Sequence, residues 1–295
     1  MNYWCKYFLL FYCVLACLST YSQNIQPIQQ QKTLHFLDSV SSLKQSLFWP
    51  NINPEKFLQN VKNNIYKPAI IYGGNGTNFC GYAAFSYSFI NNYPELYARF
   101  MIGLYNNGKA NVRKEKFNPS LAVKRAAGTF KFKGELDIHP ADQMWFLSLA
   151  DHFKGYVNFF NRKYHSGNED GLWASTNFSK FNRMLRKMCN YEVKSVGWDL
   201  IRPSLKSIPA FLKEKLQTAQ VFVYLNNTIL HKKNHNRIRK RMPTHYIVLL
   251  DIVESNGLIS LTYWDYGFKT LQQLTPKALN NIVYGITWCT KKDTL

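Results

Sequence analysis

The chain has 295 residues, of which 46% are hydrophobic and 18% charged, and its formal net charge is +20 at pH 7. An apolar fraction of this size excludes an intrinsically disordered chain and predicts a globular protein with a large core. The basic balance favours an acidic partner, such as an anionic polymer or a membrane surface, and nucleic acid is not expected; the charge can equally serve solubility alone.

The first 22 residues have the order of a secretory signal peptide. Lys6 precedes an apolar run over residues 8–18, and small and polar residues follow it up to Ser22. This run is about half the length that a membrane span needs. We therefore expect cleavage after Ser22 and an exported protein, secreted or periplasmic. In an alternative interpretation, residues 14–17 form a lipobox, and Cys17 becomes the lipid-bearing first residue of a bacterial lipoprotein.

The next part of the chain is expected to be helical. A Gln-rich stretch over residues 23–33 predicts a flexible leader, and order is expected from Leu34 in one domain that covers residues 34–295. The spacing of apolar residues predicts helices over residues 34–47, 53–65, 79–90 and 94–104, with Asn78 as the N-cap of the third. Residues 109–219 are expected to form a mostly helical insertion, with helices at 121–127, 140–160, 178–188 and 209–216.

In the last third of the chain, the pattern of apolar residues changes from that of helices to that of strands. Runs of β-branched and aromatic residues predict strands at residues 221–225, 245–253, 257–264 and 283–288. The dipeptide Asn256-Gly257 predicts a tight hairpin between the second and third of these strands. Helices followed by an antiparallel sheet predict an α+β fold.

The cysteines draw attention to one position. Three of the six lie in the predicted signal peptide, which leaves Cys80, Cys189 and Cys289, and an odd number cannot pair completely within one chain. Cys189 and Cys289 could pair with each other. Cys80 follows a glycine-rich loop and falls in the first turn of a predicted helix, where unpaired N–H groups and the helix dipole favour a thiolate. It is therefore a candidate nucleophile; a small buried cysteine is the alternative.

A cysteine nucleophile usually needs a histidine that takes its proton and a polar group that orients the ring. His245 opens a predicted strand, and the hairpin that follows brings Asp265 back to the same end of the sheet. These two residues are the expected base and orienting group. The alternative interpretation is that His245 is a satisfied edge histidine and that Asp265 only begins a turn.

The sequence around these three residues resembles the papain-like cysteine peptidases, nearest to the bacteriocin-processing type of bacterial peptidase. The matching motifs are Cys80-Gly81-Tyr82-Ala83-Ala84, His245-Tyr246-Ile247-Val248-Leu249 and Asp265-Tyr266-Gly267. The resemblance implies a catalytic triad of a thiol protease or amidase, on a nucleophile helix packed against an antiparallel sheet. It also implies an amide substrate in a protein, a peptide or peptidoglycan, with no cofactor and no metal.

Two features depart from that family. The position of its oxyanion-hole glutamine, six residues before the nucleophile, is Gly74 here, so Asn75 or Asn78 is expected to donate together with the Cys80 backbone N–H. The long segment between Cys80 and His245 is expected to cover the cleft. A transglutaminase- or deamidase-type acyl transferase stays open, as does a secreted non-catalytic protein that binds polyanions, for which the basic run at residues 231–241 is the obvious contact.

Overall fold

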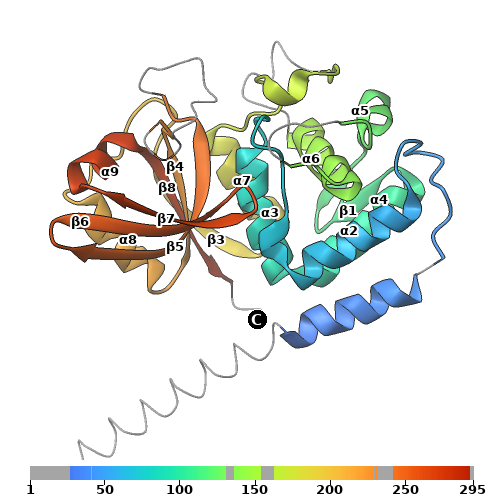
Figure 1. Ribbon diagram of the computed structural model, residues 1–295, viewed down its shortest axis with the longest axis horizontal. Coiled ribbons are helices and arrows are strands. Elements are labelled where there is room, and N and C mark those ends of the chain that lie inside the picture. The colour runs from blue at the N-terminus through green and yellow to red at the C-terminus, as the bar shows by residue number, and fades with distance from the viewer. Residues whose placement is uncertain are drawn as a thin grey trace, which may run out of the picture.

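The computed structural model describes residues 27–40, 42–130, 136–153, 163–228, 230 and 242–292. The predicted signal peptide, the lipobox with Cys17 and the basic run at residues 231–241 lie outside these ranges. Within them the protein combines helices with two antiparallel sheets, which confirms an α+β fold. A six-stranded sheet forms one side of the molecule and a helical layer the other, with α3 and α7 between them (Figure 1).

The large sheet is antiparallel throughout, in the order β3-β8-β4-β5-β6-β7. Its strands are β3 (Tyr191–Gly197), β4 (Gln220–Leu225), β5 (His245–Ser255), β6 (Leu258–Asp265), β7 (Phe268–Leu274) and β8 (Val283–Lys291). Side chains alternate between the two faces of β5: Tyr246 and Val248 join the core beneath α3, whereas Ile247 and Leu249 join the core on the opposite face. The helices α8 (Ile208–Leu216) and α9 (Pro276–Ile282) pack on that opposite face.

The helical layer contains α2 (Pro54–Tyr66), α3 (Cys80–Asn92), α4 (Pro94–Asn107), α5 (Leu121–Ala126), α6 (Pro140–Phe153) and α7 (Phe178–Met188). Two short 3-10 helices, η1 (Pro68–Ile70) and η2 (Asn168–Asp170), and a small hairpin of β1 (Ala110–Val112) and β2 (Glu115–Phe117) complete it. α2 begins where the sequence predicts, because the Asn53 side chain accepts a hydrogen bond from the Lys56 N–H and Pro54 takes the first helical position.

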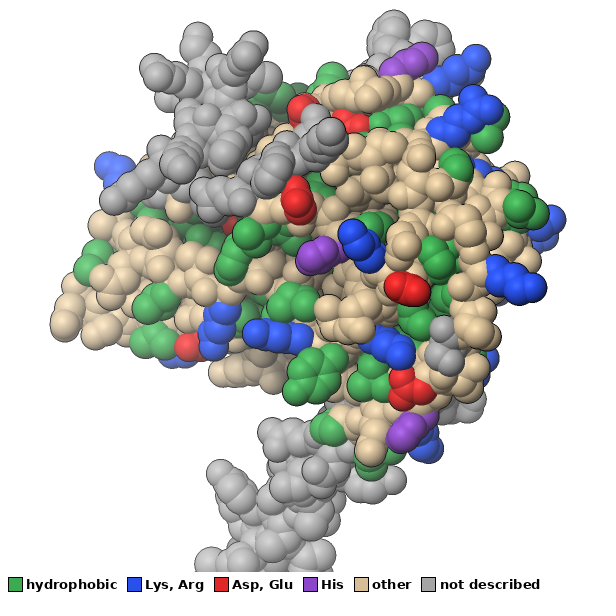
Figure 2. Space-filling model, turned by 45° about the vertical axis from the view of Figure 1, so that its right-hand side comes forward, with side chains coloured by type: hydrophobic (Ala, Val, Ile, Leu, Met, Phe, Trp, Pro, Cys, Tyr) green, Lys and Arg blue, Asp and Glu red, His purple; other side chains and the backbone are tan. Residues whose placement is uncertain are grey.

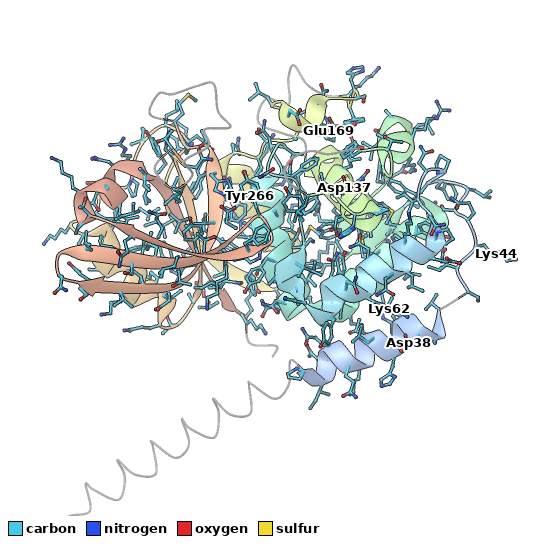
Figure 3. All side chains as sticks on the ribbon, in the orientation of Figure 1. Asp38, Lys44, Lys62, Asp137, Glu169 and Tyr266 are labelled. Carbon is cyan, nitrogen blue, oxygen red and sulfur yellow. The ribbon has the colours of Figure 1, made fainter. Side chains whose placement is uncertain are left out.

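The expected flexible leader is wrong for residues 27–33. These residues belong to a helix over residues 27–39, so helical structure begins before Leu34. Thr33 and Leu37 are buried, and the Lys62 ammonium lies 2.7 Å from the Asp38 carboxylate (Figure 3), which joins this helix to α2. The polar composition of residues 23–33 gave no sign that one side of this helix is buried. The predicted helix over 34–47 is correspondingly too long, because the described residues 42–47 are not helical.

The expected helical insertion at residues 109–219 is also only partly right. α5, α6 and α7 lie where the apolar spacing places them. However, β3 pairs with β8 inside the large sheet, and β1 and β2 form a hairpin. β3 was missed because it is an edge strand with mostly half-buried or exposed side chains, so its apolar alternation is weak.

Candidate active site

A tight loop before α3 places Cys80 at the head of that helix. Gly74 has a φ of +82°, a conformation that suits glycine, and the Thr77 hydroxyl donates to the Gly73 carbonyl oxygen at 2.7 Å. The same hydroxyl accepts a bond from the Phe79 N–H at 3.2 Å. Phe79 is the N-cap residue and contributes no side-chain cap. The Cys80 N–H therefore belongs to the first turn, where backbone donors have no partner within the helix.

Gly81 lets α3 approach the sheet closely. A Cβ atom at this position would lie 2.3 Å from Cγ2 of Thr176 and 3.1 Å from Cδ2 of Tyr246. Thr176 precedes α7, and Tyr246 is the second residue of β5. The missing side chain therefore brings the Cys80 thiol to the beginning of β5, where its sulfur lies 3.7 Å from the Thr244 carbonyl oxygen.

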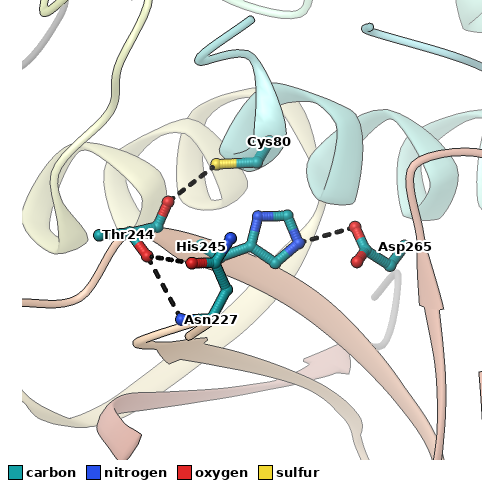
Figure 4. Close-up of polar contacts among 5 residues, drawn as sticks. All are labelled: Cys80, Asn227, Thr244, His245 and Asp265. Carbon is teal, nitrogen blue, oxygen red and sulfur yellow. Dashed lines mark hydrogen bonds and ion pairs between the residues drawn. The ribbon is translucent and has the colours of Figure 1, made fainter. Parts of the chain in front are cut away.

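His245 is the first residue of β5 and is fully buried. The strand start is fixed because the Thr244 N–H donates to the Leu225 carbonyl oxygen at 2.9 Å and the Thr244 hydroxyl donates to Asn227 Oδ1 at 2.9 Å. Nε2 of His245 lies 2.7 Å from Oδ1 of Asp265, the last residue of β6. Figure 4 shows one ring nitrogen facing Asp265, while the other is on the side of Cys80.

The surroundings of His245 favour its charged form. Burial alone would lower the pKa of the imidazole, but the charge of Asp265, the hydrogen bond to Asp265 and the hydrogen bond to the Cys80 side chain outweigh it. Together they raise the pKa of His245 to about 10. At neutral pH an imidazolium therefore lies between the Asp265 carboxylate and the Cys80 side chain.

Tyr266 is a further member of the site. Its ring stacks on the His245 ring with a centroid distance of 4.7 Å and an interplanar angle of 28°. Burial, and then the charges of Cys80 and Asp265, raise the pKa of the Tyr266 phenol well above its usual value. Sequence reasoning used Tyr266 only as part of a motif. The one available signal was a bulky residue directly before a glycine in a tight turn.

The two predicted oxyanion donors have different surroundings. Nδ2 of Asn78 donates to the carbonyl oxygens of Asp170 at 2.7 Å and Gly171 at 3.0 Å, and the Asn78 N–H donates to the Glu169 carbonyl oxygen. Asn78 therefore anchors the η2 segment. The prediction that its side chain caps α3 is wrong, because the N-cap residue is Phe79. The prediction that Asn78 donates to an oxyanion stays a prediction.

Asn75 lies in the loop itself. Its Oδ1 accepts a hydrogen bond from the Tyr72 hydroxyl at 3.1 Å, and its N–H donates to the same oxygen at 3.1 Å. The charge of Tyr72 also acts on Tyr266, so the loop that carries Asn75 borders the site.

A buried carboxyl group, that of Asp142, lies next to the first residue of this loop. Asp142 of α6 accepts a hydrogen bond from Asn64 Nδ2 at 2.6 Å, and its own N–H donates to Asn60 Oδ1 at 3.1 Å. Burial raises the pKa of Asp142 to about 7, against the opposing hydrogen bonds from Asn64, Asn60 and the Tyr72 N–H. The Tyr72 contact ties α6 to the first residue of the loop.

The disulfide that Cys189 and Cys289 could form is absent, and all three described cysteines are free. Burial raises the pKa of Cys189 well above its usual value, and burial likewise raises that of Cys289. Both thiols therefore stay protonated at neutral pH. The Cys80 side chain, in contrast, is partly exposed and lies beside the His245 ring (Figure 4).

The described residues contain no group of three or more His, Cys, Asp or Glu side chains that could hold a metal ion. A cavity of about 650 Å³ opens beside α2 and the start of α6, but Cys80, His245 and Asp265 do not line it. Among the parts of the chain that the structure describes, no helix is long and apolar enough to cross a membrane.

The chain matches no protein-family model, and comparison with curated proteins and with solved structures finds no significant match.

Proposed function

We propose that this protein is an exported cysteine hydrolase with a papain-like arrangement that cleaves amide bonds. The observation that carries the proposal is the placement of His245, whose imidazole lies 2.7 Å from Asp265 on one side and has its other nitrogen on the side of Cys80 (Figure 4). Cys80 heads a helix that packs on the antiparallel sheet, and α3 contacts both β5 and β6. Export rests on the signal-peptide pattern alone.

The geometry supports a two-step reaction. The Cys80 thiolate attacks the carbonyl carbon and forms a C–S bond, while the π electrons of the carbonyl move to its oxygen. The Cys80 N–H and Asn75 stabilise that oxyanion. Collapse breaks the C–N bond as His245 gives its proton to the leaving nitrogen. Water then attacks the thioester, His245 takes a proton from it, and the C–S bond breaks.

The proposed substrate is a protein, a peptide or a peptidoglycan crosslink, because each offers an amide carbonyl to the thiolate. If an amine replaces water in the second step, the same residues perform acyl transfer. The polyanion-binding alternative needs a concentrated basic surface. On the face shown in Figure 2, Lys and Arg side chains are spread out, with apolar and acidic side chains between them. The basic run at residues 231–241, on which this alternative rests, lies outside the described residues.

Alkylation with iodoacetamide tests the proposal, with Cys189 and Cys289 as internal references. The mature chain is treated at pH 6 to 7, and the labelled cysteines are identified by peptide mass spectrometry. We expect Cys80 to react selectively and its labelling rate, relative to that of the two buried thiols, to fall in His245→Ala. Labelling of Cys80 that does not depend on His245 would contradict the proposal.

A further inference from the structure

Tyr266 has an unusual backbone conformation for an aromatic residue. Asp265 pairs with Phe268, so Tyr266 and Gly267 alone form the turn between β6 and β7. Their φ angles are +44° and +86°, which is typical of a type I′ turn. Asn, Asp or Gly normally takes the first position of this turn, because a larger side chain is strained at positive φ. The presence of a strained tyrosine at this position therefore indicates that its side chain has a function.

The Tyr266 ring covers one face of the His245 imidazole. Its centroid is 4.7 Å from that of His245, and the imidazole has no exposed surface. Figure 3 labels Tyr266 where the sheet meets the start of α3. The charged or titratable groups around the two rings are Asp265 of β6, Cys80 of α3 and Tyr72 of the preceding loop, while Tyr263 faces Asp265.

We propose that Tyr266 is a positioning residue for His245, an inference that rests on the proposed cysteine hydrolase function. Its ring fixes the imidazole plane, so that one nitrogen stays on Asp265 while the other faces Cys80. It also keeps water from the His245–Asp265 pair, and its π face stabilises the imidazolium.

The aromatic ring, rather than the hydroxyl, carries this role. Because burial and the nearby negative charges keep the Tyr266 phenol protonated, it adds no charge to the site. A phenylalanine should therefore replace it with little loss. An asparagine should remove the ring while keeping the turn, because Asn-Gly is a favoured type I′ pair.

The test compares Tyr266→Asn and Tyr266→Phe with the unmodified mature chain. Two measurements are made: NMR titration of labelled His245, and the pH profile of Cys80 alkylation. In Tyr266→Asn we expect the pKa of His245 to fall by about one unit or more. We also expect alkylation at pH 7 to slow about tenfold, because the imidazole is no longer held in its plane beside Cys80. The melting temperature should stay the same or rise, because the strained residue is gone. Tyr266→Phe should match the unmodified chain in both measurements.

Two results would overturn the inference. One is an unchanged His245 titration in Tyr266→Asn, and the other is an equal loss in Tyr266→Phe, because that variant keeps the ring. The proposed function fails on a different measurement, namely Cys80 labelling in the unmodified chain that does not depend on His245. The NMR titration needs neither a substrate nor a reactive Cys80, so the two failures are distinguishable.

Discussion

Nε2 of His245 lies 2.7 Å from Oδ1 of Asp265, and the two side chains are 0% and 3% exposed. The pair joins the first residue of β5 to the last residue of β6. Breaking one member of a buried charged pair leaves the other without its partner, so both the protonation of His245 and the reactivity of Cys80 depend on this contact.

Asp265→Asn tests the electrostatic part of that contact. The amide keeps the shape of the carboxylate but removes its charge, so the pKa of His245 should fall and the imidazole should be neutral at pH 7. We expect the alkylation rate of Cys80 at that pH to fall by about tenfold to a thousandfold. The rate is measured by mass spectrometry of the labelled peptide. Asp137→Asn, which changes an exposed carboxylate, serves as the matched control and should leave the rate unchanged.

The raised pKa of His245 also makes stability depend on pH. The pKa of a histidine in an unfolded chain is about 6.5, whereas the contacts of His245 in the folded protein raise its pKa to about 10. The folded state therefore holds its proton more tightly. The resulting stabilisation is fully present below about pH 6.5 and is lost as the pH rises toward 10. Urea unfolding at pH 6, 8 and 10 should show this decline, and His245→Gln should make it shallower; an equal decline in both proteins would refute the assignment.

Asp142 makes the stability of the fold depend on pH over a second, lower range. Burial raises its pKa to about 7 in the folded protein, whereas the pKa of an aspartate in an unfolded chain is about 3.9. The folded state again binds the proton more tightly, so the stabilising contribution is present below about pH 4 and is lost as the pH rises through 7. Asp142→Asn should flatten the stability profile between pH 5 and 8 without altering the decline toward pH 10. Unfolding midpoints across that range measure both effects.

Gly81 should tolerate no side chain. The added Cβ of Gly81→Ala would lie 2.3 Å from Thr176 Cγ2, so α3 or the segment before α7 must move. Crowding of this kind costs about 1–3 kcal/mol, which exceeds the gain of about 1 kcal/mol in helix propensity. We expect a lower melting temperature and slower Cys80 alkylation. The double variant Gly81→Ala/Thr176→Ser lacks the clashing methyl group and should recover part of both; no recovery would mean that the clash with Thr176 is not the cause.

The parts of the fold that the sequence predicts are those with a strong local pattern. α2, α7 and the β5–β6 hairpin carry clear apolar periodicity or an Asn-Gly turn, and they form as expected. The edge strands β3 and β7 were missed, since neither buries a full face and their side chains alternate only weakly. Edge position is set by the rest of the sheet, which local sequence does not encode.

The candidate site likewise contains some contacts that the sequence predicts and others that it does not. The hairpin geometry alone brings His245 and Asp265 to one end of the sheet, so their contact was predictable from spacing. The role of Asn78 was not, because its hydrogen-bond acceptors Asp170 and Gly171 lie more than 90 positions further along the chain. The stacking of Tyr266 on His245 likewise depends on a left-handed backbone conformation that residue preferences argue against.

The two asparagines of the loop before α3 should separate catalysis from stability. Asn78→Ala removes the hydrogen bonds to Asp170 and Gly171, so it should lower the melting temperature by an amount typical of about 1–3 kcal/mol and affect the reaction only through the η2 segment. Asn75→Ala should instead reduce turnover of an amide substrate by about a hundredfold or more, with little change in the alkylation of Cys80, because alkylation forms no oxyanion. Melting curves, alkylation rates and turnover of a peptide substrate are measured for both variants. If Asn78→Ala loses turnover while its folding and alkylation are intact, then Asn78 and not Asn75 supplies the oxyanion donor.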